Sequence, residues 1–255
     1  MSIGLGLFEV LLLTAVMALG AYFQTITGFG MAMIIMGLGA GLVSIPLLAT
    51  VVSLISLVNG AIALRGQSQH IHWGITTIVL VGVIPSSIVG VILLDYLNAQ
   101  ARHLLGLLLG LLIIYSGLIF SLTPKKQKHP SNKRAFFSMG CVAGLCGGLF
   151  GMPGPPIIFQ MYQQPFALLR IRCMLLFIFA VTALSRTLYE ALVTGLPAHS
   201  LSVTLIALPS VALATVAARG FPPALGPQAM RRITFIALIV IGVFLSGHNS
   251  IALWA

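Results

Sequence analysis

Long apolar segments separated by short polar breaks run along the whole chain. Ile75–Leu94 and Leu104–Leu122 contain no charged residue, and a helix that crosses a bilayer needs about 20 mostly apolar residues. The pattern therefore predicts ten membrane-embedded helical segments. Their approximate bounds are 3–26, 29–46, 48–64, 73–94, 103–122, 135–150, 155–165, 171–194, 200–218 and 232–250.

The composition agrees with this pattern. Hydrophobic residues make up 59% of the 255 residues and charged residues 6%, whereas soluble domains carry about 25% charged residues. The chain has too few charges to cover a water-facing surface, so we predict an all-α polytopic protein of the cell membrane. The first segment has no basic start and contains Glu9, so we expect a retained helix rather than a cleaved signal peptide.

Several function classes find no support in the sequence. The net charge of +10 comes from residues in one linker and at segment ends, which is typical of loops facing anionic headgroups and not of a nucleic-acid-binding surface. The three cysteines lack the spacing of a zinc site. Protease-like motifs are missing, and three acidic residues are few for metal-dependent chemistry. We therefore expect neither an enzyme nor a cofactor.

The chain divides into two halves that look related. The hydrophilic stretch Thr123–Arg134 separates them. The glycine-rich breaks that begin at Gly28 and Gly151 lie 123 residues apart, and Pro85 and Pro209 lie 124 residues apart. Interrupted segments at matching positions are typical of transporters built from inverted repeats. We predict a first membrane repeat over 1–122, a cytoplasmic basic linker over 123–134 and a second membrane repeat over 135–255.

The basic residues predict how the segments are oriented. With the central linker in the cytoplasm and the segments alternating, Arg102 falls in an outer loop and Arg186 within a segment. The positive-inside rule then places both termini outside. The inner loops hold the other basic residues, which are Arg65, Lys125, Lys126, Lys128, Lys133, Arg134, Arg170, Arg172, Arg219, Arg231 and Arg232.

Segment 155–165 is too short to cross a bilayer. Its eleven residues would rise about 16 Å as a helix, and the hydrocarbon core is about 30 Å thick. With 135–150 it is expected to form a hairpin that enters from the cytoplasm and turns back at mid-depth. The corresponding first pair, 3–26 and 29–46, is longer, so it either crosses fully or copies the hairpin.

The breaks themselves are candidate binding sites. Irregular backbone at membrane depth is tolerated only where it is buried in protein or lines a polar cavity. Pro155 and Pro156 suit the first turn of a helix, which leaves the amides of Gly154 and Ile157 to face a ligand at its positive end. Tight turns with glycine-mediated helix packing are the alternative. The candidate anion-binding residues are Gln24, Thr27, Gly28, Phe29, Gly30, Gly151, Met152, Pro153, Gly154, Pro155 and Pro156.

Three further polar residues lie in apolar segments. Arg186 and Glu190 stand four apart, hence on one helical face, and a charge about 13 Å deep is costly unless it is paired or faces water. Arg186 either binds an anionic substrate, with Glu190 as its partner or a proton carrier, or forms a structural ion pair with it. Asn59 is either an interhelical hydrogen bonder or another residue of the binding site.

Two motifs resemble a known family. "FQTITGFGMAMII" (23–35) and "GLCGGLFGMPGPPIIF" (144–159) look like the paired signatures of the TauE/SafE family, the sulfite exporter-like or 4-toluenesulfonate uptake permeases. The length, the basic central loop and the internal duplication are similar too. The resemblance implies a multi-pass permease for sulfite, sulfonates or sulfoacetate-like acids. The motif positions that carry over are Gly28, Phe29, Gly30, Gly151, Pro153, Gly154, Pro155 and Pro156.

We therefore expect a secondary transporter that moves a small sulfur-containing anion by alternating access. Its partners would be membrane lipid, the anionic substrate and, for a coupled carrier, a proton or a sodium ion. A carrier of other small carboxylates and a channel-like pore are the alternatives. The sequence leaves the direction of transport, the coupling ion and the oligomeric state open.

Overall fold

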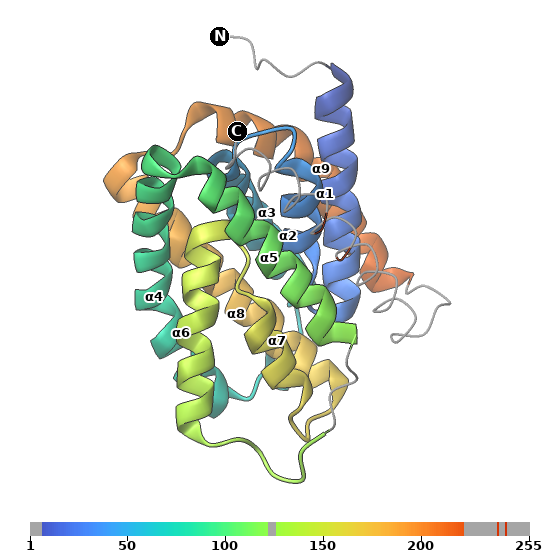
Figure 1. Ribbon diagram of the computed structural model, residues 1–255. Coiled ribbons are helices and arrows are strands. Elements are labelled where there is room, and N and C mark those ends of the chain that lie inside the picture. The colour runs from blue at the N-terminus through green and yellow to red at the C-terminus, as the bar shows by residue number, and fades with distance from the viewer. Residues whose placement is uncertain (1–6, 122–125, 222–238, 240–242, 244–255) are drawn as a thin grey trace.

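A computed structural model describes a bundle of helices, with no strand in the part of the chain that it covers (Figure 1). It describes residues 7–121 and 126–221 together with 239 and 243, so most of the expected segment 232–250 lies outside it. The helices are α1 (Leu7–Thr27), α2 (Met31–Gly39), α3 (Ile45–Ala63), α4 (Trp73–Gln100), α5 (Arg102–Ser121), α6 (Lys133–Phe150), α7 (Pro155–Tyr162), α8 (Leu168–Tyr189) and α9 (Ala198–Gly220). A 3₁₀ turn, Ser68–His70, precedes α4, and a π-helical turn, Glu190–Thr194, continues α8.

Five of the described helices are long and apolar enough to cross a membrane. They are α1, α3, α4, α8 with its π-helical turn, and α9, and they contain between 19 and 28 residues. In lipid a helix satisfies all of its backbone hydrogen bonds internally, which is why such segments fold this way. The expectation of an all-helical, multi-pass membrane protein is confirmed.

Each of the nine segments expected before residue 222 corresponds to one helix. The main difference is α2, which has nine residues where a helix over 29–46 was expected. It ends at Gly39, and α3 begins six residues later with Pro46 in its first turn, a position that favours proline. Nine residues rise about 14 Å, less than half of a bilayer core. The first pair is therefore a long helix and a short one, like α6 and α7.

Helices α4 and α6 pack backbone to backbone. Gly140, Gly144 and Gly148 stand four apart and share one face of α6. A Cβ atom on Gly144 would overlap the carbonyl oxygen of Val83, and one on Gly148 would overlap that of Ser87. Only glycine allows two helices to approach so closely. This packing fixes α6, and the break that follows it, against the long helix α4.

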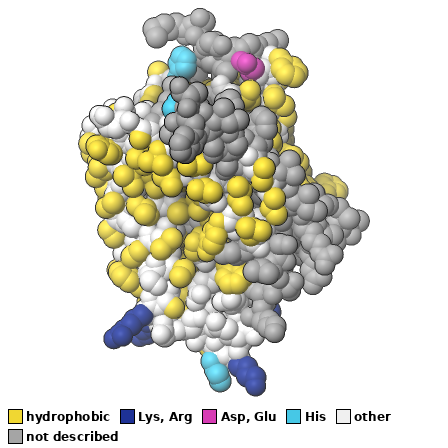
Figure 2. Space-filling view, in the orientation of Figure 1, with side chains coloured by type: hydrophobic (Ala, Val, Ile, Leu, Met, Phe, Trp, Pro, Cys, Tyr) yellow, Lys and Arg dark blue, Asp and Glu magenta, His cyan; other side chains and the backbone are white. Residues whose placement is uncertain are grey.

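The surface separates into a hydrophobic band and two polar ends. In Figure 2 apolar side chains form a broad band across the middle of the described surface, and Lys and Arg lie at one end. That end carries the linker before α6 (Figure 1). The linker is hydrogen-bonded to the loop between α7 and α8. The backbone N–H of Gln127 donates to the backbone carbonyl of Gln163 (2.8 Å), and Lys126 Nζ donates to the backbone carbonyl of Phe166 (3.3 Å). We call this the linker end of the molecule.

Candidate functional site

The first helix break lies between α1 and α2. Gly28 and Gly30 have φ angles of 86° and 109°, a region that glycine enters without steric strain. These two residues let the chain leave α1 and start α2 at Met31, and the two helices pack against each other. The second half of the chain holds this break, since the Tyr162 hydroxyl of α7 donates to the Thr27 carbonyl (2.7 Å).

The second break, between α6 and α7, is built from the same parts. Gly151 and Gly154 have φ angles of 64° and 68°. Pro155 and Pro156 occupy the first turn of α7, as the sequence predicts. Because proline has no amide hydrogen, the N–H groups nearest the start of α7 are those of Gly154 and Ile157.

A small cavity lies between the two breaks. Its volume is about 10 Å³, which is room for about one water molecule. Gly30 and Gly154, the residues that immediately precede α2 and α7, both line it. The lining residues are Gln24, Gly30, Ala32, Met33, Ser56, Met152, Pro153, Gly154, Ile158 and Phe179.

The cavity is therefore bordered by the N-terminal ends of two helices. Each such end carries unpaired N–H groups and roughly half of a positive charge. Gln24 of α1 and Ser56 of α3 add two polar side chains to walls that are otherwise backbone and apolar groups. This arrangement suits a small anion. No group of three His, Cys, Asp or Glu side chains that suits a metal ion occurs among the described residues.

Asn59 is fully buried and does not line the cavity itself; it contacts Gln24, which does. Its amide nitrogen donates to the hydroxyls of Thr25 and Thr215 (both 2.9 Å), and its amide oxygen accepts from Gln24 Nε2 (3.0 Å). Each threonine hydroxyl donates its own hydrogen within its helix, so it accepts from Asn59 and fixes the orientation of that amide. Asn59 thus joins α1, α3 and α9 and orients Gln24.

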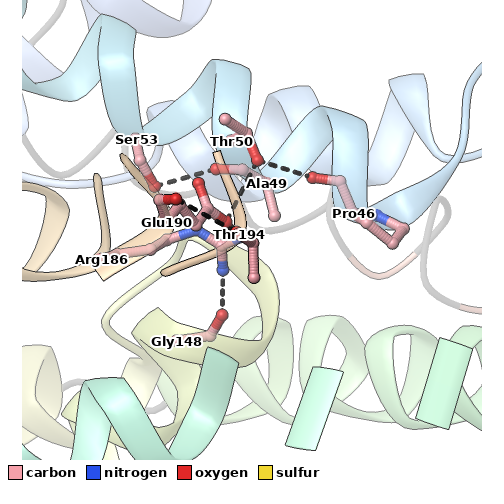
Figure 3. A network of polar contacts seen from close by, with 8 residues as sticks. All are labelled: Pro46, Ala49, Thr50, Ser53, Gly148, Arg186, Glu190 and Thr194. Carbon is pink, nitrogen blue, oxygen red and sulfur yellow. Dashed lines mark hydrogen bonds and ion pairs between the residues drawn. The ribbon is translucent and has the colours of Figure 1, made fainter. Parts of the chain in front are cut away.

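Arg186 and Glu190 form a buried ion pair (Figure 3). Arg186 Nη2 donates to Glu190 Oε1 (2.6 Å), and Thr50 Oγ1 of α3 lies 3.2 Å from the same oxygen. Arg186 Nη1 donates to the Gly148 carbonyl in the last turn of α6. Arg186 Nε and Glu190 Oε2 are buried and have no hydrogen-bond partner among the described residues. The pair connects α8 to α3 and to the helix end that precedes the second break.

The structure sorts the residues that the sequence singled out into three groups. Those that line the cavity are Gln24, Gly30, Met152, Pro153 and Gly154. Those that lie in the breaks or beside them without lining it are Thr27, Gly28, Phe29, Gly151, Pro155 and Pro156. Those that lie outside the lining, on α3 and on α8 and its continuation, are Asn59, Arg186 and Glu190.

Five of the residues that line the cavity were not predicted from the sequence. Ala32, Met33 and Ile158 follow the two breaks within the first helical turn, so their nearness to a break was an available signal. Phe179 lies in the apolar middle of α8, where hydrophobic periodicity marks no inward face. Ser56 belongs to a row of buried polar residues spaced three apart on α3, and this row was an available signal for an inward face. The row consists of Thr50, Ser53, Ser56 and Asn59.

The comparisons with known proteins agree with each other. The family model described as sulfite exporter TauE/SafE matches residues 12–245. A protein of Cupriavidus necator (strain H16) named "Probable sulfite/organosulfonate exporter TauE" is 44% identical over 241 residues, which cover 94% of each chain. No solved structure matches significantly. With a family match over most of its length and a relative this similar, the chain belongs to the sulfite exporter TauE/SafE family of membrane transport proteins.

Proposed function

We propose that this chain is a secondary transporter that exports a small sulfur-containing anion, sulfite or an organosulfonate, across the cell membrane. The observation that carries the proposal is the cavity that both helix breaks border, with Gly30 and Gly154 at the starts of α2 and α7. The name of the relative from Cupriavidus necator supports the substrate class and the outward direction.

The chemistry of the cavity fits an oxyanion. Gly30 and Gly154 have no side chain, so a sulfite or sulfonate group can approach the backbone N–H groups of both helix starts. Gln24 uses one N–H of its amide for Asn59 and has a second N–H to offer the anion. The apolar walls at Met33, Ile158 and Phe179 exclude water, which strengthens these polar interactions.

The narrowness of the cavity favours a carrier over a channel-like pore. With room for about one water molecule, the site holds a sulfite ion only after the two breaks move apart. A carrier binds its substrate in a site that opens to one side at a time, so we propose alternating access. An open pore would need a continuous passage instead.

We further propose that the two halves, 1–122 and 135–255, are inverted repeats joined by a cytoplasmic linker at 123–134. Each half begins with a long helix, a glycine-rich break and a short helix. Each also carries a proline inside a later helix, Pro85 in α4 and Pro209 in α9. The Lys and Arg side chains at the linker end (Figure 2) support a cytoplasmic linker.

For coupling, we propose that Glu190 carries a proton, with a sodium ion as the alternative coupling ion. Of the three acidic residues of the chain, Glu190 is the buried one, and a buried carboxylate within a membrane span is a candidate proton carrier. A pH gradient should then drive sulfite movement in vesicles, and Glu190→Gln should abolish that dependence. Flux that follows a sodium gradient alone would contradict this assignment.

Reconstitution tests the main proposal. The purified full chain in proteoliposomes should move radiolabelled sulfite saturably, and unlabelled taurine or sulfoacetate should compete better than acetate. Empty vesicles and vesicles with the cavity-filling variant Ser56→Leu are the controls. Flux that rises linearly with concentration would indicate a pore, and stronger competition by carboxylates would indicate a carboxylate carrier.

A further inference from the structure

Helix α8 carries three residues on one face that lie at or near the two breaks and the cavity. Arg172, Phe179 and Arg186 are spaced seven residues apart, which is close to two helical turns and about 10 Å along the axis. Phe179 lines the cavity. Arg186 lies beyond it and binds the Gly148 carbonyl at the second break. Arg172 lies on the other side of the cavity, toward the linker end.

Arg172 lies directly against the first break. A Cβ atom on Gly28 would be 3.0 Å from Arg172 Cα and 3.2 Å from its Cγ. The one ion pair among the described residues is Arg186–Glu190, so none of their carboxylates pairs with the Arg172 guanidinium. Its Nε is buried and has no hydrogen-bond partner among these residues.

The side chain of Arg219, a neighbouring arginine, has hydrogen-bond partners, whereas that of Arg172 is half-buried and has none among the described residues. Arg219 donates to the carbonyl oxygens of Ile62 (2.6 Å) and Arg65 (3.0 Å) and so caps the end of α3. Arg172 makes no such bond within the described part of the chain. A half-buried arginine without a counter-charge costs free energy in a membrane protein, and such residues typically mark the path of an ion.

We propose that Arg172 forms an access subsite for the anion, one step before the cavity on the side of the linker end. This inference rests on the proposed transport function and deepens it. The anion would meet an unpaired charge at Arg172, pass Gly28 and enter the cavity at Gly30. On the other side Arg186 is paired with Glu190, so while Glu190 is ionised the stronger attraction acts from the linker end. That asymmetry suits export if the linker is cytoplasmic.

A lipid headgroup is the other source of an oxyanion for Arg172. The exposure of the two arginines at the start of α8 argues against it, because Arg170 is exposed whereas Arg172 is half-buried. A headgroup at the membrane surface would reach Arg170 more readily. Arg170 is therefore the matched control, with the same charge and nearly the same depth.

The test uses inside-out vesicles, in which the cytoplasmic face meets the added substrate. The initial rate of sulfite entry is measured against sulfite concentration for the parent, Arg172→Gln, Arg172→Lys and Arg170→Gln. A unit charge about 10 Å from the bound anion changes its affinity roughly two- to fifteen-fold for an effective dielectric constant between 80 and 20. Arg172→Gln should raise KM by such a factor and leave the maximal rate and the melting temperature unchanged. Arg172→Lys should keep most of the affinity.

Ionic strength and lipid composition complete the test. High salt should raise the KM of the parent toward that of Arg172→Gln, because a partly exposed charge is screened. An Arg172→Gln protein that behaves like Arg170→Gln would overturn the access subsite while transport itself stands. If Arg172→Gln raises KM in vesicles that contain phosphatidylglycerol but not in pure phosphatidylcholine, Arg172 binds a lipid headgroup. That result would also overturn the access subsite. If the parent moves neither sulfite nor a sulfonate, the proposed function fails and the subsite falls with it.

Discussion

Removing one member of the Arg186–Glu190 pair should destabilise the protein more than removing both. Three variants test this: Arg186→Gln, Glu190→Gln and the double variant. In either single variant one buried charge loses its partner, since Arg186 is fully buried and Glu190 nearly so. In the double variant no charge remains in that region of α8, so the main penalty disappears.

The magnitudes follow from the contacts. Leaving one charge of a buried pair uncompensated typically costs about 3–5 kcal/mol. Arg186 also donates to the Gly148 carbonyl, and a hydrogen bond to a charged group contributes about 1.5–3 kcal/mol. A glutamine at position 186 is too short to keep that bond. The double variant should therefore lie about 1.5–3 kcal/mol below the parent, about 2 kcal/mol above Glu190→Gln, and about 3–5 kcal/mol above Arg186→Gln, which loses the Gly148 bond as well.

The assay is thermal unfolding of the purified protein in detergent, together with sulfite binding. A change of 1 kcal/mol shifts the melting temperature of a chain of this size by about 2–4 °C, so the rescue is measurable. Ser185→Ala is the control, because among the described residues the Ser185 hydroxyl bonds only to the Val181 carbonyl of its own helix. A double variant less stable than both single variants would refute the structural pair.

Sulfite binding by the same variants separates the two roles of Arg186. If the pair is structural, the double variant should recover binding together with stability. If Arg186 holds the anion, Arg186→Lys should keep part of the binding, since the point charge survives without its planar fork. Both Arg186→Gln and the double variant should then bind almost nothing. Recovered binding in the double variant would exclude the anion-site role.

Three further predictions concern the cavity, the glycine contact and the orientation. Asn59→Ala should lower stability by about 2–4 kcal/mol, because it leaves buried partners unsatisfied, and should weaken sulfite binding by releasing Gln24; unchanged binding would contradict its positioning role. Gly144→Leu should cost at least about 3 kcal/mol through overlap with α4, whereas Gly41→Ala, with nothing within 4 Å of the new Cβ, should be neutral in the same unfolding assay. In a variant without native cysteines, a cysteine in the linker (126–132) should react with a membrane-impermeant reagent only from the cytoplasm; labelling from outside would contradict the proposed orientation.

The helices and the breaks could be predicted because membrane physics leaves few alternatives. A spanning segment must be apolar, about 20 residues long and helical, so its limits show in the sequence. The glycines and prolines at Gly28–Gly30 and Gly151–Pro156 have no place in an uninterrupted helix. The structure ends and starts helices at both places. Arg186 and Glu190, four residues apart, are in contact as their spacing implies.

The inner surface of the cavity could not be predicted in the same way. The middle of α8 is apolar on all sides, so nothing in its sequence says which face meets the breaks. The polar row of α3 indicates an inward face but not which of its residues reaches the cavity. Ser56 is one of several small polar residues in α3, and Phe179 is one of two phenylalanines in a short stretch of α8. Only the packing of the helices distinguishes them. Asn59 is a related case. The sequence shows a polar residue within an apolar segment, but it does not show that Gln24 lies between Asn59 and the cavity.

The glycine contact between α4 and α6 limits how this molecule can move. Sliding α6 by one turn along α4 would bring the Phe136 side chain to the place of Gly140, where even a Cβ atom overlaps the Val79 carbonyl. A phenylalanine ring does not fit there, so α4 and α6 can pack in only one register and form a rigid pair. Because the Gly148 carbonyl of this pair also accepts from Arg186, the second break is fixed to α4 and α8. In the proposed transport cycle, the cavity wall that moves to admit a substrate is then the other one, formed by α1, α2 and the helices packed against them.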